Sequence, residues 1–269
     1  MVDQRLNAWE TLFQRALEIL DAAPRAGTML RDWSFGGGTV LMRRHRHRLS
    51  TGIDIFLPDP RLLGHLSPRL NPAIESLTTD YDEQANSLKL YFPQGEIDFV
   101  VAGSLTANPV TIERIHGRDV NVETSAEIIA KTIWYRGAEF TARDLFDFAL
   151  VAEREPRALR NARDVLRARR TIVLEQISDR EEALREDFAA LDALEFRPSF
   201  EQCVDAVRQA LVPGAARAPH RAEQRRARYR VARAAIGEGV PVEISAQVGL
   251  RRRTISNEAF AFSSSPSPT

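Results

Sequence analysis

Hydrophobic residues in the first part of the chain recur with the spacing of a helix. Between residues 6 and 20 they fall three or four positions apart, which predicts an amphipathic helix with one buried face. Pro24 and Gly27 are expected to end this helix. Residues 30 to 35 are then expected to form a short strand, the three glycines that follow a turn, and residues 39 to 47 a short helix.

Strand-like patterns follow and predict the rest of a sheet. Residues 53 to 57 alternate around Asp54 and stop at Pro58. The apolar runs 88–92 and 96–101 flank the turn signal Pro93-Gln94-Gly95 and predict a β-hairpin. Residues 110 to 122 predict a second hairpin. Residues 59 to 80, which prolines interrupt, are expected to be helical or irregular.

Helical spacing returns near residue 124. Thr124 and Glu127 have the spacing of a capping box, and the predicted helix that follows carries Lys131. A second helix is expected from residue 141, where Arg143 and Asp147 lie four positions apart and are expected to pair. Residues 157 to 235 predict three or four more helices, and the Ser/Pro-rich end, 263–269, is expected to be disordered. Strands followed by helices indicate an α+β fold class.

Composition narrows the class of protein. The 269 residues suit one large domain or two modest ones, and the net charge of zero gives no global attraction to nucleic acid or membrane. Cys203 is the only cysteine, which excludes a disulfide framework or a Cys-based zinc site within one chain. The N-terminus lacks a signal-peptide core, and no apolar run approaches the roughly 20 residues of a membrane span. A soluble, cytoplasmic protein without membrane contact is expected.

Two aspartates within predicted strands are candidate metal ligands. Asp54 and Asp98 each lie among apolar strand residues, and carboxylate oxygens are ligands that Mg²⁺ prefers. One or two carboxylates suffice when a triphosphate supplies the remaining oxygens. The alternative is that each aspartate is a polar residue at a strand end that faces solvent. Because the same pattern occurs twice, this alternative is weaker than it would be for either residue alone.

The glycine turn and the segment after it are candidates for phosphate binding. Gly36-Gly37-Gly38 leaves backbone N–H groups accessible to an anion, and the helix expected from Thr39 would add the positive end of its dipole. Arg48 and Ser50 offer charge and a hydroxyl donor to the same phosphates. The turn lacks the Gly-Lys-Ser/Thr ending of a Walker loop, so an ordinary tight turn is the alternative.

Charged residues later in the chain also have two interpretations. Lys131 lies on a half-buried predicted helix, where it would neutralise a triphosphate or be an ordinary surface lysine. Arg143, Asp144 and Asp147 are expected to form salt bridges that hold two helices together. Arg outnumbers Asp and Glu after residue 201, and the basic runs 225–230 and 251–253 are either solvated faces or contacts for an RNA backbone.

In this order, the motifs resemble the AbiEii/AbiGii toxin family within the polymerase-β-type nucleotidyltransferase superfamily. The resemblance covers about residues 27 to 150 and the helical part beyond them. As a set the motifs are fairly specific, although no single one is. The matching pieces are Gly37-Gly38-Thr39, His47-Arg48-Leu49-Ser50, Ile53-Asp54-Ile55-Phe56, Asp98, Lys131 with Arg136, and Arg143-Asp144 with Asp147.

The resemblance implies a fold and a function. It implies a nucleotidyltransferase-type mixed sheet flanked by helices in residues 1–122, a helical C-terminal domain in residues 123–236 and a tail in residues 237–269. It implies a bacterial toxin, active in phage defence and paired with an antitoxin encoded nearby, that transfers a nucleotide from an NTP to tRNA or another RNA with Mg²⁺ or Mn²⁺. By the same resemblance, Asp54 and Asp98 would bind metal and act in catalysis with Lys131 and Asp144. The nucleotide would be bound by Gly37, Gly38, Thr39, Arg48, Ser50 and Lys131.

Gly52 departs from the family pattern. The pattern has an acidic residue two positions before Asp54, where it would share a strand face with Asp54 and chelate the metal jointly. Its loss is expected to reduce activity by roughly 10²-fold or more. Three explanations are open: the chain is inactive, water or another carboxylate such as Asp59 or Asp82 substitutes, or the protein binds nucleotide or RNA without catalysis.

Three hypotheses about function follow. The first is a nucleotidyltransferase toxin whose activity Gly52 would reduce. The second is a non-catalytic RNA- or protein-binding module on the same fold, which the basic C-terminal third favours. The third is an enzyme of similar fold that modifies a small molecule, such as an aminoglycoside nucleotidyltransferase. Fold analogy supports much of the functional inference, so the site itself has to decide among them.

Overall fold

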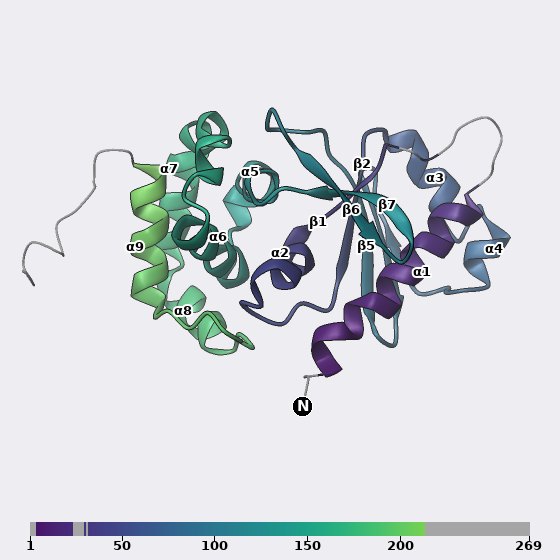
Figure 1. Ribbon diagram of the computed structural model, residues 1–269, viewed down its shortest axis with the longest axis horizontal. Coiled ribbons are helices and arrows are strands. Elements are labelled where there is room, and N and C mark those ends of the chain that lie inside the picture. Colours follow the sequence, from purple (N-terminus) through teal and green to yellow (C-terminus); the bar gives the residue numbers. More distant parts are fainter. Residues whose placement is uncertain (1–3, 24–29, 31, 213–269) are drawn as a thin grey trace, which may run out of the picture. The chain divides into compact units, whose positions relative to one another are not determined.

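A seven-stranded mixed sheet is the centre of the computed structural model, which describes residues 4–23, 30 and 32–212. The strand order is β3-β4-β5-β2-β1-β7-β6 (Figure 1). The pairs β2–β5 and β1–β7 are parallel, and every other neighbouring pair is antiparallel. The strands are β1 (Ser34–Gly36), β2 (Ile53–Leu57), β3 (Tyr81–Glu83), β4 (Ser87–Phe92), β5 (Gly95–Val101), β6 (Val110–Ile115) and β7 (Arg118–Glu123).

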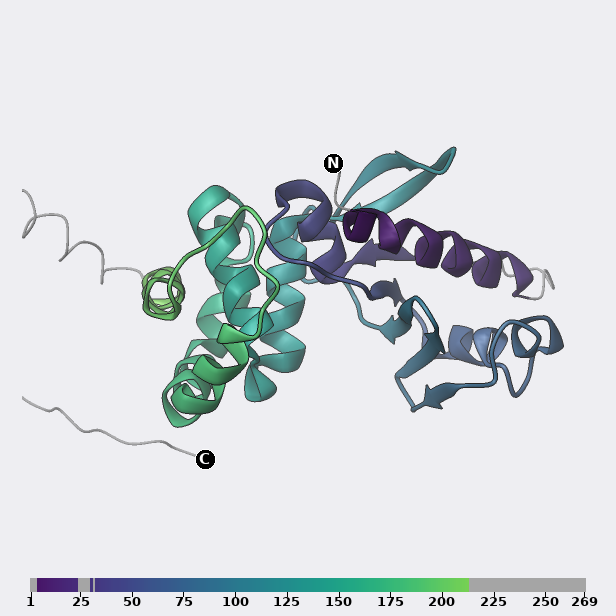
Figure 2. The same ribbon diagram turned by 90° about the horizontal axis from the view of Figure 1, so that it is seen from below.

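Helices flank this sheet. Figures 1 and 2 both show α5 to α9 grouped together on one side, away from α1, α3 and α4. The α-helices of the described part are α1 (Ala8–Ala22), α2 (Gly37–His45), α3 (Leu63–Leu66), α4 (Pro72–Glu75), α5 (Ser125–Arg136), α6 (Ala142–Arg154), α7 (Arg163–Asp179), α8 (Glu181–Ala189) and α9 (Phe200–Leu211). Short 3₁₀ turns are η1 (Gln4–Asn7), η2 (Pro60–Leu62), η3 (Gly137–Glu139) and η4 (Ala158–Arg160).

The alternation within β1 and β2 gives this part of the sheet one apolar and one polar face. Ile53 and Ile55 are buried, and Phe35 shares their face because it is the register partner of Ile55. Helix α1 covers this face, with the ring of Phe13 centred 4.6 Å from that of Phe35. Asp54 is therefore left on the opposite face, where the candidate site lies.

Most predicted elements are present, with ends shifted by a few residues. The predicted first helix is α1, the strand at 53–57 is β2, and the two hairpins are β4–β5 and β6–β7. The second hairpin turns at His116 and Gly117, whose φ values of 47° and 76° suit a tight hairpin turn. The strand predicted over residues 30 to 35 is wrong in extent, because only Ser34–Gly36 pairs with neighbouring strands.

The helical prediction for the second half is confirmed as far as the structure describes the chain. Helices α7, α8 and α9 and the short turn η4 lie in the described part of residues 157 to 235, with a non-helical segment over residues 190–199. The predicted tail, 237–269, and both basic runs lie outside the described residues. The domain boundary at residue 122 stays a prediction.

The capping box predicted at Thr124 is only half formed. Thr124 accepts a hydrogen bond from the backbone N–H of Glu127. The Glu127 carboxylate, however, accepts from the backbone N–H groups of Leu105 and Thr106, so it fixes the preceding loop onto α5. A complete capping box forms one helix later, between Thr141 and Asp144 at the start of α6.

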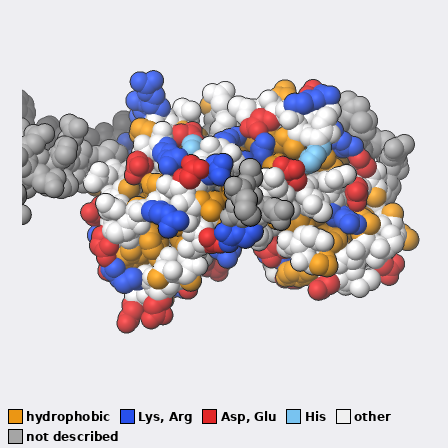
Figure 3. Space-filling view, turned by 60° about the horizontal axis from the view of Figure 1, so that its bottom comes forward, with side chains coloured by type: hydrophobic (Ala, Val, Ile, Leu, Met, Phe, Trp, Pro, Cys, Tyr) orange, Lys and Arg blue, Asp and Glu red, His pale blue; other side chains and the backbone are white. Residues whose placement is uncertain are grey.

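Charges of both signs are mixed on the face of the molecule that Figure 3 draws. On the face drawn in Figure 3, blue basic and red acidic side chains alternate with orange hydrophobic ones. This distribution gives the drawn face no broad field of one sign among the described residues, which agrees with the balanced composition. Among the described helices, none has both the length and the apolar character required to cross a membrane.

Candidate active site

A row of register partners, called the acidic row below, crosses the polar face of the sheet; its outermost member is the exposed Asp82 on the edge strand β3, which pairs with Lys89. Gly36, Asp54, Asp98 and Lys89 are successive partners on β1, β2, β5 and β4. The Lys89 Nζ lies 3.0 Å from Asp98 Oδ2. The two aspartates that the sequence places far apart are therefore neighbours in the middle of the sheet. Neither is an isolated residue at a strand end.

The glycine turn fits directly against acidic side chains. Gly37 has a φ of 71°, and a Cβ added to it would overlap Asp54 Oδ2. A Cβ added to Gly36 would overlap Oε2 of Glu123. The glycines are thus required both by backbone conformation and by the close approach of carboxylates, which an ordinary tight turn does not require. The turn opens α2, and the N-terminus of a helix attracts anions.

Burial and mutual repulsion change the titration of the two aspartates. Burial, together with the nearby charge of Asp98, raises the pKa of Asp54 to about 7, although Arg136 opposes the shift. Burial also raises the pKa of Asp98, although its hydrogen bond with Lys89 opposes that shift. Asp54 is therefore close to half-protonated at neutral pH. A cation bound between the two carboxylates would favour their charged forms.

Lys131 is a buried member of an ion-pair cluster beside this row. Its Nζ lies 2.5 Å from Glu123 Oε1, 3.8 Å from Glu127 Oε1 and 3.9 Å from the centre of the Phe56 ring. The Ser34 hydroxyl donates to the same Glu123 oxygen at 2.9 Å. Burial raises the pKa of Glu123 although Lys131 is adjacent. The interpretation of Lys131 as a surface lysine is wrong, and its contact with a nucleotide stays a prediction.

Asp147 joins the segment after α2 to α6. Arg48 donates from Nε and Nη2 to its two oxygens, at 2.7 and 2.6 Å, and His47 Nε2 lies 2.7 Å from Oδ1. Burial alone would raise the pKa of Asp147, but the charge of Arg48 and the hydrogen bond with His47 lower it to about 2. The predicted pair of Asp147 with Arg143 is therefore wrong. Arg143 is exposed, whereas a bidentate buried partner occupies both oxygens of Asp147.

Arg48 also supports the glycine turn. A Cβ added to Gly38 would lie 2.5 Å from Arg48 Nη2, so the guanidinium packs against the turn. Arg48 donates hydrogen bonds to Asp147 and to the Leu49 carbonyl. These contacts give Arg48 a positioning role. Its predicted role in nucleotide binding stays a prediction.

Asp144 caps α6 and holds a second arginine. Its Oδ2 accepts from the N–H and the hydroxyl of Thr141, at 2.9 and 2.8 Å, and lies 3.3 Å from Arg136 Nη2. The charge of Arg136 lowers the pKa of Asp54 and of Asp98 against the stronger effect of burial. Asp144 thus holds Arg136 at a position from which its positive charge stabilises the charged forms of Asp54 and Asp98. A catalytic role for Asp144 itself stays a prediction.

Thr39 and Ser50 connect α2 to the segment that enters β2. The Thr39 hydroxyl lies 2.5 Å from the carbonyl oxygen of Gly52 and 2.9 Å from Ser50 Oγ. Both hydroxyls have protein partners, and their binding of nucleotide stays a prediction. At Gly52, an added Cβ would make only ordinary van der Waals contact, 3.5 Å from Glu96 Cγ. Lack of space for a Cβ therefore does not explain why position 52 has no acidic residue.

The donor set fits a divalent metal that a nucleotide helps to bind. Asp54 and Asp98 present carboxylates side by side, and Glu123 Oε2 is buried without a hydrogen-bond partner among the described residues. Within those same residues, no three His, Cys, Asp or Glu side chains are grouped tightly enough to hold a metal by themselves. Mg²⁺ and similar ions are commonly held by one or two carboxylates, substrate phosphates and water. The residues fit that kind of site.

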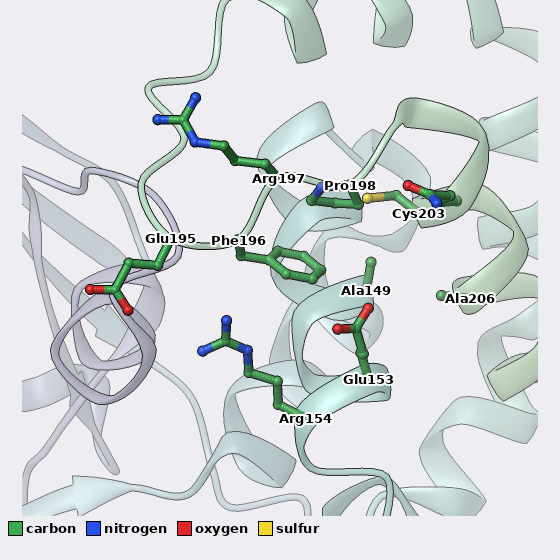
Figure 4. A pocket seen from close by; sticks show the side chains of 10 residues that line it. Ala149, Glu153, Arg154, Glu195, Phe196, Arg197, Pro198, Cys203 and Ala206 are labelled. Carbon is green, nitrogen blue, oxygen red and sulfur yellow. The ribbon is translucent and has the colours of Figure 1, made fainter.

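A separate cavity of about 440 Å³ lies between α6 and α9 (Figure 4). Its lining includes Ala149, Arg154, Phe196 and Cys203 and none of the acidic row. Burial raises the pKa of the Cys203 thiol to about 12, so it stays protonated and is a poor nucleophile. The candidate active site is therefore the polar face of the sheet.

Comparison with known families identifies the chain. The sequence profile of the family described as "Nucleotidyl transferase AbiEii toxin, Type IV TA system" matches residues 26–218, which include every residue of the acidic row and the glycine turn. The chain belongs to this family. Membership of the AbiEii toxin family implies a cognate antitoxin, and the predicted fold class is confirmed by the mixed sheet and its flanking helices.

Solved structures similar to this AbiEii-family chain are distant in sequence. JHP933 from Helicobacter pylori is 15% identical with a TM-score of 0.42, over 88% of this chain and 100% of that one. MenT4, a nucleotidyltransferase toxin from Mycobacterium tuberculosis H37Rv, is 18% identical with a TM-score of 0.42, over 85% of this chain and 92% of that one. The search of curated proteins gave no match.

Sequence reasoning missed three charged residues of this AbiEii-family site. Glu96 lies two positions before Asp98, so strand alternation alone would have placed both on one face. No comparable pattern in the sequence indicated that Lys89 or Glu123 would belong to the site. Their proximity to Asp98 and Lys131 depends on which strands are neighbours and on how α5 packs.

Proposed function

We propose that this AbiEii-family chain is a metal-dependent nucleotidyltransferase that transfers a nucleotide from an NTP to RNA, with tRNA as the acceptor. The supporting observation is the register pair Asp54–Asp98 beside Gly37, at the N-terminus of α2. A carboxylate pair suits a divalent metal, and the N-terminus of a helix at a glycine turn suits phosphate. The two sites are adjacent, as a metal–triphosphate complex requires.

In the proposed reaction, a hydroxyl oxygen of the RNA forms a bond to the α-phosphorus of the NTP. The bond from that phosphorus to the bridging oxygen breaks, pyrophosphate leaves, and the hydroxyl proton passes to water. The metal, when bound, neutralises charge on the phosphates. Asp54 and Asp98 would hold it, and the N–H groups of the turn at Gly37 and Gly38 would bind phosphate oxygens.

Two arginines would support these groups in different ways. Arg136 places positive charge near the acidic row, where it would offset the charge of the phosphates. Arg48, held by Asp147, keeps the glycine turn in place because it packs against Gly38. Positioning of this kind provides most of the catalysis in phosphoryl transfer.

The test is transfer of radiolabel from each α-labelled NTP to total tRNA with Mg²⁺ or Mn²⁺. Asp54→Asn is expected to reduce labelling by roughly 10²-fold or more, because it removes a charged ligand. Asp82→Asn is the matched control. Asp82 is an exposed aspartate on the edge strand β3, which β4 and β5 separate from β2, and its change should leave labelling within about twofold. Absence of labelling by the wild type and also by Gly52→Asp would contradict the proposal.

A non-catalytic RNA-binding module is the second candidate, and Gly52 is the observation that favours it. Without an acid at this position, the site has fewer metal ligands than the family pattern provides. This candidate predicts RNA binding that weakens steeply with salt and does not change in Asp54→Asn. Filter binding across a salt series measures both properties. A large loss of RNA affinity in Asp54→Asn would argue against it.

A further inference from the structure

A glutamate on the neighbouring strand occupies the space beside Gly52. Ile53 pairs with Ile97 and Asp54 with Asp98 in parallel register. Continuing this register one residue toward the N-terminus places Glu96 beside Gly52. A Cβ added to Gly52 would lie 3.5 Å from Glu96 Cγ and 3.8 Å from Glu96 Oε1. The side chain of Glu96 thus lies in van der Waals contact with the point where a side chain at position 52 would begin.

Glu96 faces the same space as Asp98. The two residues are two apart on β5, which puts both side chains on one face of the sheet. A single ammonium joins them: Lys89 Nζ lies 3.1 Å from Glu96 Oε1 and 3.0 Å from Asp98 Oδ2. The Glu96 side chain is 43% exposed, so a ligand can reach it without unfolding any element.

The other carboxylates considered for this position are less suitable. Asp59 binds the side chain and the backbone N–H of Arg61 in an exposed turn after β2. Asp82 is exposed on β3, and Lys89 on β4 lies between it and Asp98. Neither is next to Gly52 in the sheet, whereas Glu96 is.

A second feature of the site points to a positively charged ligand. Glu123 Oε2 is buried without a hydrogen-bond partner among the described residues, next to Gly36. Gly36 is the register partner of Asp54. Lys131 Nζ, 2.5 Å from Oε1, already compensates the charge of Glu123. Within the described part of the chain, Oε2 still lacks a donor or a second cation, and a buried oxygen without either is unfavourable.

We propose that Glu96 replaces the acidic residue absent at Gly52 and, when the metal–nucleotide complex binds, completes the metal site of Asp54 and Asp98; in the structure these three carboxylates are not yet grouped as a ligand set. This inference rests on the proposed function, because it assigns a further ligand to the same metal site. Lys89 is then the counter-ion of Glu96 and Asp98 before the metal–nucleotide complex binds. The change from the family pattern is a relocation of one carboxylate from β2 to β5, so Gly52 does not by itself disarm the toxin.

The test measures binding of Mn²⁺ by electron paramagnetic resonance, with α,β-methylene-ATP present and no RNA. Wild type, Glu96→Gln, Gly52→Asp, the double variant of these two and Asp54→Asn are compared, with Asp82→Asn as the control. Glu96→Gln is expected to weaken Mn²⁺ binding about tenfold or more, and Asp82→Asn by less than about twofold. Gly52→Asp is expected to restore affinity in the Glu96→Gln protein and to change the wild type much less, because the two acids would serve the same position.

The outcomes separate this inference from the proposed function. If Asp54→Asn abolishes Mn²⁺ binding while Glu96→Gln does not change it, the inference is wrong and the metal site stands. If Gly52→Asp raises affinity by the same factor in both backgrounds, Glu96 does not serve the position of residue 52. If Asp54→Asn also leaves Mn²⁺ binding unchanged, the proposed function itself fails. Thermal unfolding curves check that each variant is folded, which the exposure of Glu96 and the space beside Gly52 lead us to expect.

Discussion

Replacing Asp54 by Asn should stabilise the metal-free protein above neutral pH. The pKa of Asp54 rises from 3.8 to about 7 on folding because of burial and the charge of Asp98. At about 1.4 kcal/mol per pKa unit, this shift corresponds to about 4 kcal/mol. Asn fills nearly the same volume without the charge, so the variant avoids this penalty.

The sign of the pH dependence follows from the direction of the shift. A carboxyl group whose pKa is raised by folding stabilises the protein in its protonated form. This stabilisation is complete below pH 4 and is lost as pH rises to about 7, the folded-state value. The advantage of Asp54→Asn should therefore be near zero at pH 4 and should reach its full size above pH 7.

Thermal unfolding in EDTA at several pH values measures this effect. A change of 4 kcal/mol should raise the Tm of Asp54→Asn by about 10 °C at pH 8. Adding Mn²⁺ with α,β-methylene-ATP should raise the Tm of the wild type but not of the variant, because binding to the folded state stabilises it. Asp82→Asn should follow the wild type throughout. Equal stability of Asp54→Asn and wild type at pH 8, or the same advantage at pH 4 and pH 8, would refute the reasoning.

Three further predictions concern the glycine turn, the ion pair of Asp147 and the buried Cys203. Gly37→Ala should lower stability by about 2–3 kcal/mol in urea unfolding, because it adds a clash with Asp54 to the strain at φ 71°. Asp147→Asn should lower it by about 3–5 kcal/mol, because it leaves the buried Arg48 charge uncompensated. In the wild-type protein, the pKa of Asp147 is lowered to about 2. The protein should therefore keep the stabilisation from this ion pair above pH 4 and lose it as Asp147 is protonated toward pH 2. Cys203 should react with a thiol reagent only as fast as the protein opens, which mass spectrometry can follow.

Each of these predictions has its own control. Gly117 has a similar φ of 76°, with open space where a Cβ would lie, so Gly117→Ala should lower the free energy of unfolding by only about 1 kcal/mol. An equal loss of stability in Gly37→Ala and Gly117→Ala would contradict the clash with Asp54. Asp119→Asn breaks an exposed ion pair and should change stability by less than about 1 kcal/mol; a similarly small loss in Asp147→Asn would contradict its anchoring role. Rapid labelling of Cys203 in folded protein at neutral pH would contradict its burial.

The sequence predicted the elements of the site more reliably than their contacts. The glycine turn, the helix after it and the strands around Asp54 and Asp98 follow from local rules for backbone conformation and alternation. The predicted pair of Arg143 and Asp147 failed because it assumed that residues four apart on one helix select each other. In the fold, Arg48 reaches Asp147 from a distant segment and binds both of its oxygens.

The sequence by itself determined the family and the order of the elements. It determined which side chains share a face, because strand and helix periods are fixed by backbone geometry. It also determined that position 52 has no acid. Only the tertiary structure decided which strands are neighbours. In the chain, β3 and β4 lie between β2 and β5. In the sheet, β2 pairs directly with β5, because this pairing buries the apolar residues of β2 and β5. That pairing places Asp98 beside Asp54 and Glu96 beside Gly52, and no local pattern contains this information.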